Sequence, residues 1–258
     1  MHFTRALVRL PSEHFSAGIT SAIGGGNPDF DLALAQHGQY CDALRICGLQ
    51  ILSLAPDARH PDSTFVEDTA ILTQRVAIIT RPGAASRLGE AAATLAKLRD
   101  LFTTIRQITS PGTVDGGDVC EIDGEFVIGW SQRTNAEGIR QLTEFLAEFG
   151  YQSRVIDIRG CKALLHLKSG MSYIGDGVCV ISVETPFADA LKQYQLITVT
   201  SEEDYAANCL RVNERILLAE GFPRIAETLT GRNFQVLTVP MSEFRKMDGG
   251  LSCLSLRF

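Results

Sequence analysis

Cys253 follows a double glycine near the end of the chain, in the stretch Asp248-Gly249-Gly250-Leu251-Ser252-Cys253. The residues after it alternate between apolar and polar, which predicts a short, half-buried strand that begins at the cysteine. The glycine pair permits a tight turn or a close approach of the backbone to a ligand. A thiol held there is a candidate nucleophile, because a thiolate attacks electron-poor carbon. The alternative is a core cysteine, since unpaired cysteine is among the most buried residue types.

Four other loops finish in residues that could take part in the same chemistry. These loop ends are Val66-Glu67-Asp68, Gly116-Gly117-Asp118, Leu164-Leu165-His166 and Ala207-Asn208-Cys209. Each has an ordinary alternative, because acids form solvated turns and buried histidines and thiols are often structural. Together, a thiol, an imidazole and several acids suit attack on a carbon bonded to nitrogen. The imidazole can protonate a departing amine, and paired carboxylates can bind a planar guanidinium. We therefore expect a guanidino substrate rather than a peptide, with no metal and no other cofactor.

The elements that must position these residues repeat along the chain. Each repeat is predicted as a helix, a lone strand, a loop and a hairpin-like pair of strands. The predicted helices are 29–47, 84–99, 134–149, 186–193 and 221–231, and the lone strands are 50–55, 104–109, 153–158, 196–200 and 235–240. The predicted pairs are 70–72 with 76–80, 119–122 with 126–130, 165–168 with 172–182, and 209–212 with 215–219. The turn Asp123-Gly124 is a strong hairpin signal.

The fifth repeat has only one such strand, 253–258, and the segment 3–10 can supply its partner. Five similar units closed by both chain ends predict an α/β fold, a five-module αβ propeller with a central channel. We expect 1–258 to form this propeller as a single domain, with the five loop ends at one end of the channel. A doubly wound parallel sheet is the alternative, but the repeated hairpins and the terminal strand favour the closed form.

The amino-acid composition limits the classes of protein to which this chain can belong. The 258 residues are 45% hydrophobic and 21% charged, which is ordinary for a globular protein, and the net charge of −6 disfavours a nucleic-acid partner. Seven scattered cysteines without a CxxC pair exclude a zinc knuckle and a thioredoxin motif, and they indicate a reduced, cytoplasmic protein. We expect no signal peptide and no membrane span, because no apolar run is long enough.

At the residues singled out above, the sequence resembles the guanidino-group-modifying (pentein) superfamily, and most closely its dimethylarginine dimethylaminohydrolase family. The resemblance covers nearly the whole chain. The matching segments are 60–68, 80–84, 111–118, 131–135, 165–168, 205–208 and 248–253. The resemblance implies a five-module αβ propeller that hydrolyses Nω-methylated L-arginines to citrulline and methylamine or dimethylamine, through a cysteine thiouronium intermediate.

The resemblance also implies roles for individual residues. Cys253 would be the nucleophile, His166 the general acid and base, and Asp115 the acidic partner of His166. The implied substrate-binding residues are Glu67 and Asp68 for the guanidinium, Asp62 for the α-amino group, Arg87 and Arg133 for the α-carboxylate, and the backbone of Ile19 and Met247. Asp118 and Asp248 would be supporting residues, and Asp118 could exchange its role with Asp115. The glycine-rich segment 18–28 departs from the family pattern and is expected to be a mobile lid.

Two other functions stay open at this point. One is an arginine deiminase or a citrulline-hydrolysing enzyme of the same superfamily; the deiminases that resemble this family are longer and carry a helical insertion, which favours a methylarginine substrate. The other is a non-catalytic pentein that binds the ribosome, which the acidic net charge and the Cys, His and Asp set disfavour. The resemblance makes a homodimer plausible.

Overall fold

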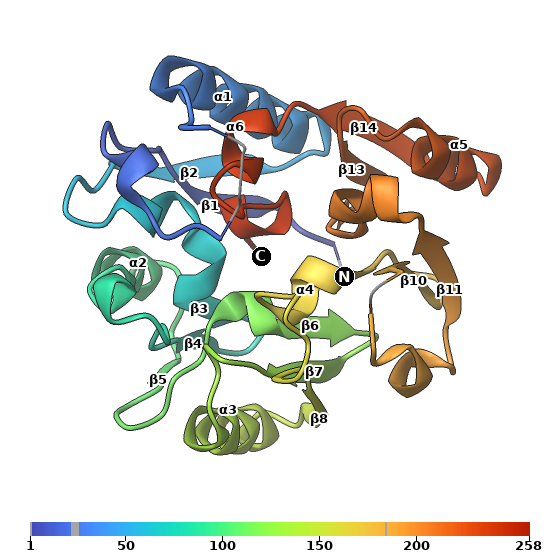
Figure 1. Ribbon diagram of the computed structural model, residues 1–258. Coiled ribbons are helices and arrows are strands. Elements are labelled where there is room, and N and C mark those ends of the chain that lie inside the picture. The colour runs from blue at the N-terminus through green and yellow to red at the C-terminus, as the bar shows by residue number, and fades with distance from the viewer. Residues whose placement is uncertain (1, 22–25, 184) are drawn as a thin grey trace. The chain divides into compact units, whose positions relative to one another are not determined.

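A computed structural model describes residues 2–21, 26–183 and 185–258 of the chain (Figure 1). The chain divides into two compact units, which we call unit 1 (residues 1–66 and 209–258) and unit 2 (residues 67–208). Within the described residues, unit 1 contains two three-stranded sheets and unit 2 contains three. Over the same residues, the helices are too short or too polar to serve as membrane spans.

The three sheets of unit 2 share one plan. They are β3 (Ala70–Leu72), β4 (Ala77–Ile79) and β5 (Ile105–Gln107); β6 (Val119–Ile122), β7 (Glu125–Trp130) and β8 (Gln152–Asp157); and β9 (Met171–Tyr173), β10 (Val178–Ser182) and β11 (Gln195–Val199). In each sheet the first two strands form an antiparallel hairpin, and the third lies parallel to the second. A parallel partner requires a crossover. The crossovers are α2 (Ala91–Arg99), α3 (Ala136–Glu148) and the 3₁₀ turn Ala188–Leu191.

Unit 1 follows the same plan, and one of its sheets joins the chain ends. That sheet has the order β15 (Leu256–Arg257), β1 (Arg5–Arg9) and β2 (Gln50–Leu54), with α1 (Phe30–Ile46) as its crossover. The other sheet contains β12 (Leu210–Val212), β13 (Arg215–Ala219) and β14 (Gln235–Val239), with the crossover α5 (Pro223–Gly231). The short helix α6 (Ser242–Arg245) follows β14. The predicted pairing of the termini is confirmed; it is antiparallel, with Ala6 opposite Arg257 and Leu7 opposite Leu256.

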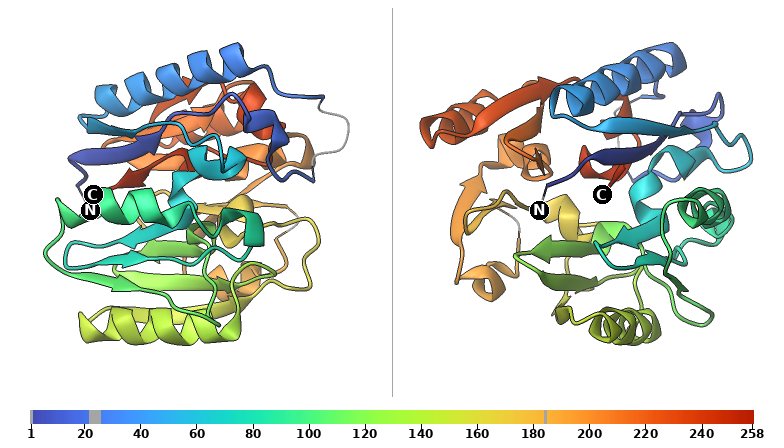
Figure 2. Two further views of the ribbon diagram at one scale, coloured as in Figure 1. Left: turned by 90° about the vertical axis from the view of Figure 1, so that its left-hand side faces the viewer. Right: turned by 180° about the vertical axis from the view of Figure 1, so that it is seen from behind.

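Local sequence signals explain several of these elements. The carboxylate of Asp29 accepts a hydrogen bond from the Leu32 amide at 2.9 Å and so caps the start of α1. In the β6–β7 turn, Asp123 and Gly124 have φ values of 50° and 87°, as a two-residue hairpin turn requires. The helices α1 and α3 then lie along the sheets that they cross over (Figure 2).

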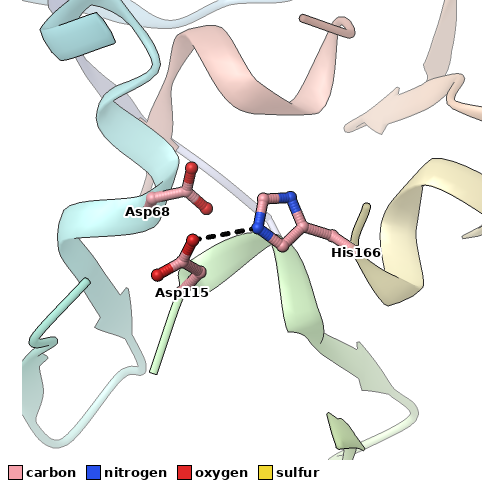
Figure 3. A group of neighbouring side chains, drawn as sticks. All are labelled: Asp68, Asp115 and His166. Atoms are coloured by element: carbon pink, nitrogen blue, oxygen red, sulfur yellow. Dashed lines mark hydrogen bonds and ion pairs between the residues drawn. The ribbon is translucent and has the colours of Figure 1, made fainter. Parts of the chain in front are cut away.

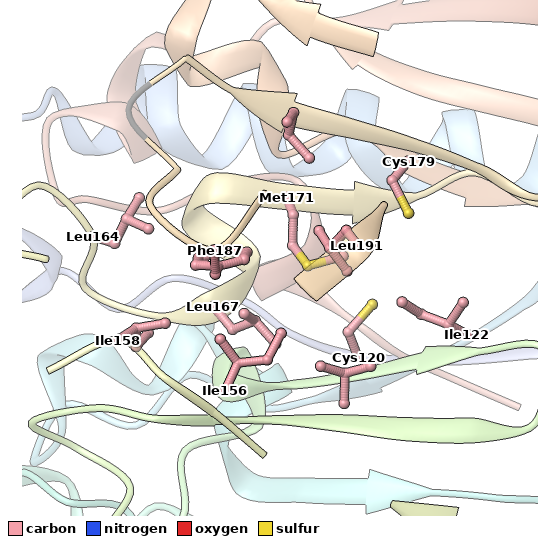
Figure 4. Packing of buried hydrophobic residues seen from close by; sticks show 12 residues of the cluster. Cys120, Ile122, Ile156, Ile158, Leu164, Leu167, Met171, Cys179, Phe187 and Leu191 are labelled. Atoms are coloured by element: carbon pink, nitrogen blue, oxygen red, sulfur yellow. The ribbon is translucent and has the colours of Figure 1, made fainter. Parts of the chain in front are cut away.

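Buried apolar side chains of β6, β9 and β10 form one core of unit 2 (Figure 4). Leu167, the first residue of the short helix α4 (Leu167–Gly170), is fully buried in this core. Met171, the first residue of β9, is buried beside it. Leu167 begins α4 and Met171 directly follows it. Because packing fixes both residues, the core also fixes the backbone next to His166.

Four sequence predictions of local structure are wrong. The predicted strand 165–168 is absent, because helix α4 begins at Leu167. The predicted strand 172–182 is a hairpin, because Gly175, Asp176 and Gly177 all adopt positive φ and reverse the chain. The predicted helix 84–99 is interrupted, with a 3₁₀ turn at Ala85–Arg87 before α2. The predicted strand 253–258 is shorter, because Ser252–Leu254 form a 3₁₀ turn that places Cys253 before β15.

Deleting residues 254–258 is expected to destabilise unit 1 and to abolish the activity that the resemblance implies. The deletion removes the buried Leu254 and Leu256 and the backbone hydrogen bonds between Phe258 and Arg5, at 2.8 and 3.0 Å. Loss of two buried leucines costs on the order of 3–6 kcal/mol. Urea unfolding and turnover measure the effect, with a chain that is extended beyond Phe258 by a short Gly-Ser tail as the control. A truncated chain that is folded and active would refute the structural role of the terminal strand.

Candidate active site

Three of the predicted loop ends meet in unit 2. Asp68, Asp115 and His166 are buried, and one side-chain oxygen or nitrogen atom of each lies within 4.8 Å of those of the other two (Figure 3). The Nε2 atom of His166 lies 3.0 Å from Oδ2 of Asp115. The prediction that the loop ends converge is therefore correct for these three.

Asp68 is an ionised carboxylate held by protein donors. Its Oδ2 accepts a hydrogen bond from Nη1 of Arg87 at 2.6 Å, and its Oδ1 accepts one from the amide of Gly117 at 2.8 Å. Burial raises the pKa of Asp68, but the charges of His166 and Arg87 and these hydrogen bonds lower it to about 2. The hydroxyl of Thr80 donates to the Asp68 carbonyl and fixes the backbone.

His166 is positively charged at neutral pH. Burial by itself lowers the pKa of His166, but the carboxylates of Asp68, Asp118 and Asp115 together raise it to about 9. Both ring nitrogens then carry a proton, and Nε2 donates to Asp115. The other oxygen of Asp115 accepts a hydrogen bond from the Gly83 amide at 2.7 Å, which fixes the carboxylate that orients the imidazole. Such a pair can supply a proton to a leaving group.

Asp118 positions the backbone next to His166. Its Oδ1 accepts a hydrogen bond from the Leu167 amide at 3.0 Å, at the start of α4. Its Oδ2 accepts from the hydroxyls of Ser131 and Thr134, both at 2.6 Å. Burial raises the pKa of Asp118 to about 6, against the opposing effects of His166 and of these donors. In the structure, Asp115 and not Asp118 makes the hydrogen bond to the imidazole.

The glycine pair between these two aspartates is required by close packing. A Cβ atom on Gly117 would lie 2.8 Å from the imidazole of His166, and one on Gly116 would overlap the Glu67 carbonyl. The pair thus allows the loop that carries Asp115 to approach both Asp68 and His166. Only a residue without a side chain fits at these two places.

The two arginines predicted to bind the α-carboxylate differ in the structure. Arg87 is 5% exposed, and besides Asp68 it contacts Glu90, to which Nη2 donates at 2.8 Å and Nε at 3.0 Å. Its neighbouring carboxylates hold the pKa of Arg87 well above its usual value. Arg133 is partly exposed, and its guanidinium makes no hydrogen bond or ion pair with the part of the chain that the structure describes. Arg133 therefore remains available to an anion, and Arg87 is already committed to protein carboxylates.

Four other predicted site residues belong to unit 1. Both carboxylate oxygens of Asp62 accept hydrogen bonds from the Ile19 amide, at 3.0 and 3.2 Å, so these two residues lie together. Asp248 accepts hydrogen bonds from the amide and hydroxyl of Ser21, at 2.6 and 2.9 Å. Met247 is buried. The segment predicted as a lid is thus tied to this unit at 19–21, and its residues 22–25 lie outside the described residues.

Cys253 lies in the 3₁₀ turn before β15 and is partly exposed. Its Sγ accepts a hydrogen bond from the Gly250 amide at 3.4 Å, and its own amide donates to the Gly250 carbonyl at 3.2 Å. The preceding turn depends on Gly249, where a Cβ atom would overlap the ring of Phe65. The double glycine therefore holds the thiol by close packing and by an amide donor.

The types of residue at Asp68, Asp115 and His166 could bind a metal ion, but their atoms are already paired. The oxygens of Asp68 accept from Arg87 and Gly117, and those of Asp115 accept from Gly83 and His166. A ligating histidine must also be neutral, and the pKa of His166 is raised to about 9. The arrangement suits proton transfer and binding of an organic cation better than a metal.

Sequence reasoning missed two residues that touch this site. Glu90 holds Arg87, and Lys168 donates from Nζ to Oε1 of Glu67 at 2.6 Å. Glu90 follows Arg87 by three positions, a spacing typical of local ion pairs, and could have been found from it. Nothing in the local sequence around Lys168 identifies a partner 101 positions away.

Solved structures define the class of fold. The chain is similar to a dimethylarginine dimethylaminohydrolase from Pseudomonas aeruginosa, a cysteine-to-serine mutant complexed with citrulline, at a TM-score of 0.96 and 39% identity over 100% of both chains. It is similar in fold to the N-terminal domain of a cyanobacterial arginine dihydrolase, at a TM-score of 0.88 and 18% identity, over 100% of this chain and 97% of that one. The five three-stranded sheets found among the described residues fit five modules, so the predicted pentein fold class is confirmed.

The family follows from the sequence matches. A model of eukaryotic N,N dimethylarginine dimethylhydrolases matches residues 29–255. N(G),N(G)-dimethylarginine dimethylaminohydrolases of Pseudomonas aeruginosa and Streptomyces coelicolor are 40% and 35% identical to the chain, over 99% and 98% of its length and 100% and 96% of theirs. The chain belongs to the dimethylarginine dimethylaminohydrolase family and is a hydrolase.

Proposed function

We propose that this protein hydrolyses Nω-methylated L-arginines, both asymmetric dimethylarginine and monomethylarginine, to L-citrulline and dimethylamine or methylamine. The observation that carries the proposal is the buried cluster of Asp68, Asp115 and a protonated His166, in a chain of this family. Carboxylates attract a guanidinium, and an imidazolium can protonate the amine that leaves. No cofactor takes part.

The proposed reaction has two stages. The Cys253 thiolate adds to the guanidinium carbon, and His166 gives a proton to the methylated nitrogen. The C–N bond breaks, dimethylamine leaves, and an S-alkylthiouronium remains. Neutral His166 then takes a proton from water, whose oxygen adds to the same carbon. The C–S bond breaks as the added hydroxyl loses its proton, which passes through solvent to the released amine, and citrulline and the thiolate are released.

Two structures of relatives support these roles. One is the cysteine-to-serine mutant complexed with citrulline, and the other is a histidine-to-glycine variant of a dimethylarginine dimethylaminohydrolase as an adduct with S-methyl-L-thiocitrulline, at 40% identity and a TM-score of 0.95. That second structure covers 99% of this chain and 100% of its own. We carry these roles over to Cys253 as the nucleophile and His166 as the general acid and base.

The proposed binding residues follow from the charges that they offer. Asp68 and Glu67 supply negative potential to the guanidinium. Arg133, whose guanidinium has no hydrogen bond or ion pair among the described residues, would accept the α-carboxylate. Asp62 would meet the α-amino group, with the backbone of Ile19 and Met247 as further contacts. Arg87 would be a further contact of the α-carboxylate, as the resemblance implies. The predicted homodimer and the cytoplasmic location stay predictions.

A substrate panel tests the proposed reaction. Purified protein is supplied with dimethylarginine, monomethylarginine, L-arginine or citrulline, and the citrulline and the amine released are measured separately. We expect citrulline with dimethylamine or methylamine from the first two substrates. Ammonia from L-arginine as the dominant product would instead support the deiminase alternative, and no turnover of any substrate would contradict a catalytic function.

A further inference from the structure

Thr134 makes two hydrogen bonds that link the two aspartates on either side of the glycine pair. Its side chain is fully buried. The hydroxyl oxygen Oγ1 accepts a hydrogen bond from the Asp115 amide at 3.1 Å and donates to Oδ2 of Asp118 at 2.6 Å. Asp115 pairs with the imidazole of His166 (Figure 3), and Asp118 binds the amide of the residue that follows His166. One buried hydroxyl therefore contacts both groups that position the imidazole.

Backbone amides fix the direction of these hydrogen bonds. A hydroxyl has one proton, and an amide N–H can only donate. Because the Asp115 amide donates to Thr134, the proton of Thr134 is directed to Asp118. Ser131 is arranged in the same way: its Oγ accepts from the amides of Arg133 and Thr134, at 2.9 and 3.0 Å, and donates to the same Asp118 oxygen at 2.6 Å. Both hydroxyl protons thus point at Oδ2 of Asp118.

Asp118 has donors at both of its oxygens. Oδ2 accepts from the two hydroxyls, and Oδ1 accepts from the Leu167 amide at 3.0 Å. A proton on this carboxyl group would face a donor on either side, so the network favours the ionised form. Burial opposes it and raises the pKa of Asp118 to about 6. The charge of Asp118 at neutral pH therefore depends on these donors.

The charge of Asp118 in turn acts on His166. Among the described residues of unit 2, the charged groups that face the imidazole are carboxylates from the neighbouring turns: Asp68, Asp115 and Asp118. Two cations contact acids at the same turns, Arg87 at Asp68 and Lys168 at Glu67. Burial lowers the pKa of His166, and the three carboxylates raise it to about 9. Loss of the negative charge on Asp118 would therefore lower the pKa of His166.

We propose that Thr134 is a positioning residue for the acid–base pair: together with Ser131 it keeps Asp118 an ionised acceptor, it holds the backbone of Asp115, and so it keeps His166 placed and protonated for transfer to the leaving amine. The catalytic consequence rests on the proposed function, whereas the effect on His166 can be measured without turnover. A merely structural role of Thr134 would change stability and would leave the charge of the imidazole unchanged.

Thr134→Val tests the proposal, because valine is close to threonine in shape but has no hydroxyl. The variant removes one donor from Asp118 and the acceptor of the Asp115 amide. We expect the pKa of His166 to fall by about half a pH unit or more, as an NMR titration of the ring resonances measures, with His166→Gln used to assign them. We also expect kcat for asymmetric dimethylarginine to fall about tenfold or more, because the acid–base pair is displaced. Thr134→Ser restores the hydroxyl and should return kcat to within about threefold of the unaltered protein.

The matched control is Thr73→Val. Thr73 is also buried, in the turn between β3 and β4. Its hydroxyl donates to the Val76 carbonyl at 3.1 Å and accepts from the amides of Arg75 and Val76, at 3.1 and 3.0 Å. The control variant thus loses hydrogen bonds of the same kind at another place in unit 2. We expect it to be less stable in urea, with no change in the pKa of His166.

The outcomes separate this proposal from the proposed function. If the unaltered protein releases neither dimethylamine nor methylamine, the proposed function is wrong, and the NMR titration still decides the role of Thr134. If a folded Thr134→Val variant keeps the pKa of His166, or if Thr73→Val lowers that pKa equally, the role of Thr134 is refuted. If Thr134→Val does not fold, Ser131→Ala decides, because it removes the other hydroxyl donor of the same carboxylate oxygen. A lower pKa of His166 in that variant would support the proposal, and an unchanged one would overturn it.

Discussion

Replacing Cys253 by serine is expected to abolish turnover while leaving ligand binding largely intact. The serine hydroxyl can still accept the hydrogen bond that the Gly250 amide donates to Sγ, so the 3₁₀ turn at Ser252–Leu254 should persist. An alcohol is a far weaker nucleophile than a thiolate, and loss of a covalent nucleophile commonly costs roughly 10³-fold or more in kcat. Steady-state release of citrulline measures the loss, and calorimetric titration with a methylarginine measures binding.

The matched control is Cys161→Ser, which changes another partly exposed thiol. It should retain near-normal kcat, and a haloacetamidine should label Cys253 in this variant, with methylarginine protecting it. A Cys253→Ser variant with near-normal rates would remove this residue from the mechanism. Labelling that methylarginine does not block would place the thiol away from the substrate.

His166→Gln is expected to lower kcat by about 10²- to 10⁴-fold, because the variant lacks the group that protonates the amine and later activates water. Stability should also fall, since three buried carboxylates lose the cation between them. The control is His60→Gln, which removes a histidine that lies 2.9 Å from Asp57. Product assays and urea unfolding compare the two variants. If both lose activity equally, the role of His166 as the acid and base is contradicted.

The pH dependence of stability provides a second readout for His166. Folding raises the pKa of His166 from 6.5 to about 9, so the folded protein binds this proton more tightly than the unfolded chain. The resulting stabilisation, roughly 3 kcal/mol, is fully present below the unfolded pKa and is lost as the pH rises through 9. The difference in unfolding free energy between the unaltered protein and His166→Gln should therefore shrink between about pH 6 and about pH 10. A difference that stays constant would show that the imidazole does not carry the predicted charge.

Much of the fold could be predicted because its signals are local. Helix α1 is bounded by the cap at Asp29 and by Gly48 at positive φ, and the β6–β7 hairpin by Asp123 and Gly124. The repeated order of these elements indicated the pentein fold. The pairing of the two termini followed from counting strands, since one repeat lacked a partner that only 3–10 could supply.

The sequence failed where tertiary contacts override a local pattern. Residues 165–168 have the apolar character of a strand, yet the Asp118 carboxylate binds the Leu167 amide, and Leu167 is buried in the core of unit 2. These two long-range contacts stabilise the turn of helix α4 instead. A single sequence contains no measure of either contact, so a strand was the natural prediction.

By itself, the sequence determined which groups could act: a thiol after two glycines, a histidine after an apolar pair, and two aspartates that flank Gly116-Gly117. It also determined the repeat that suggested their convergence. Only the tertiary structure decided which groups pair, because the partners are 51 positions apart for His166 and Asp115, and 101 apart for Lys168 and Glu67. The charge on an imidazole and the availability of a carboxylate depend on such neighbours and on burial. The protonated state of His166 and the engagement of Glu67 by Lys168 are therefore properties of the fold.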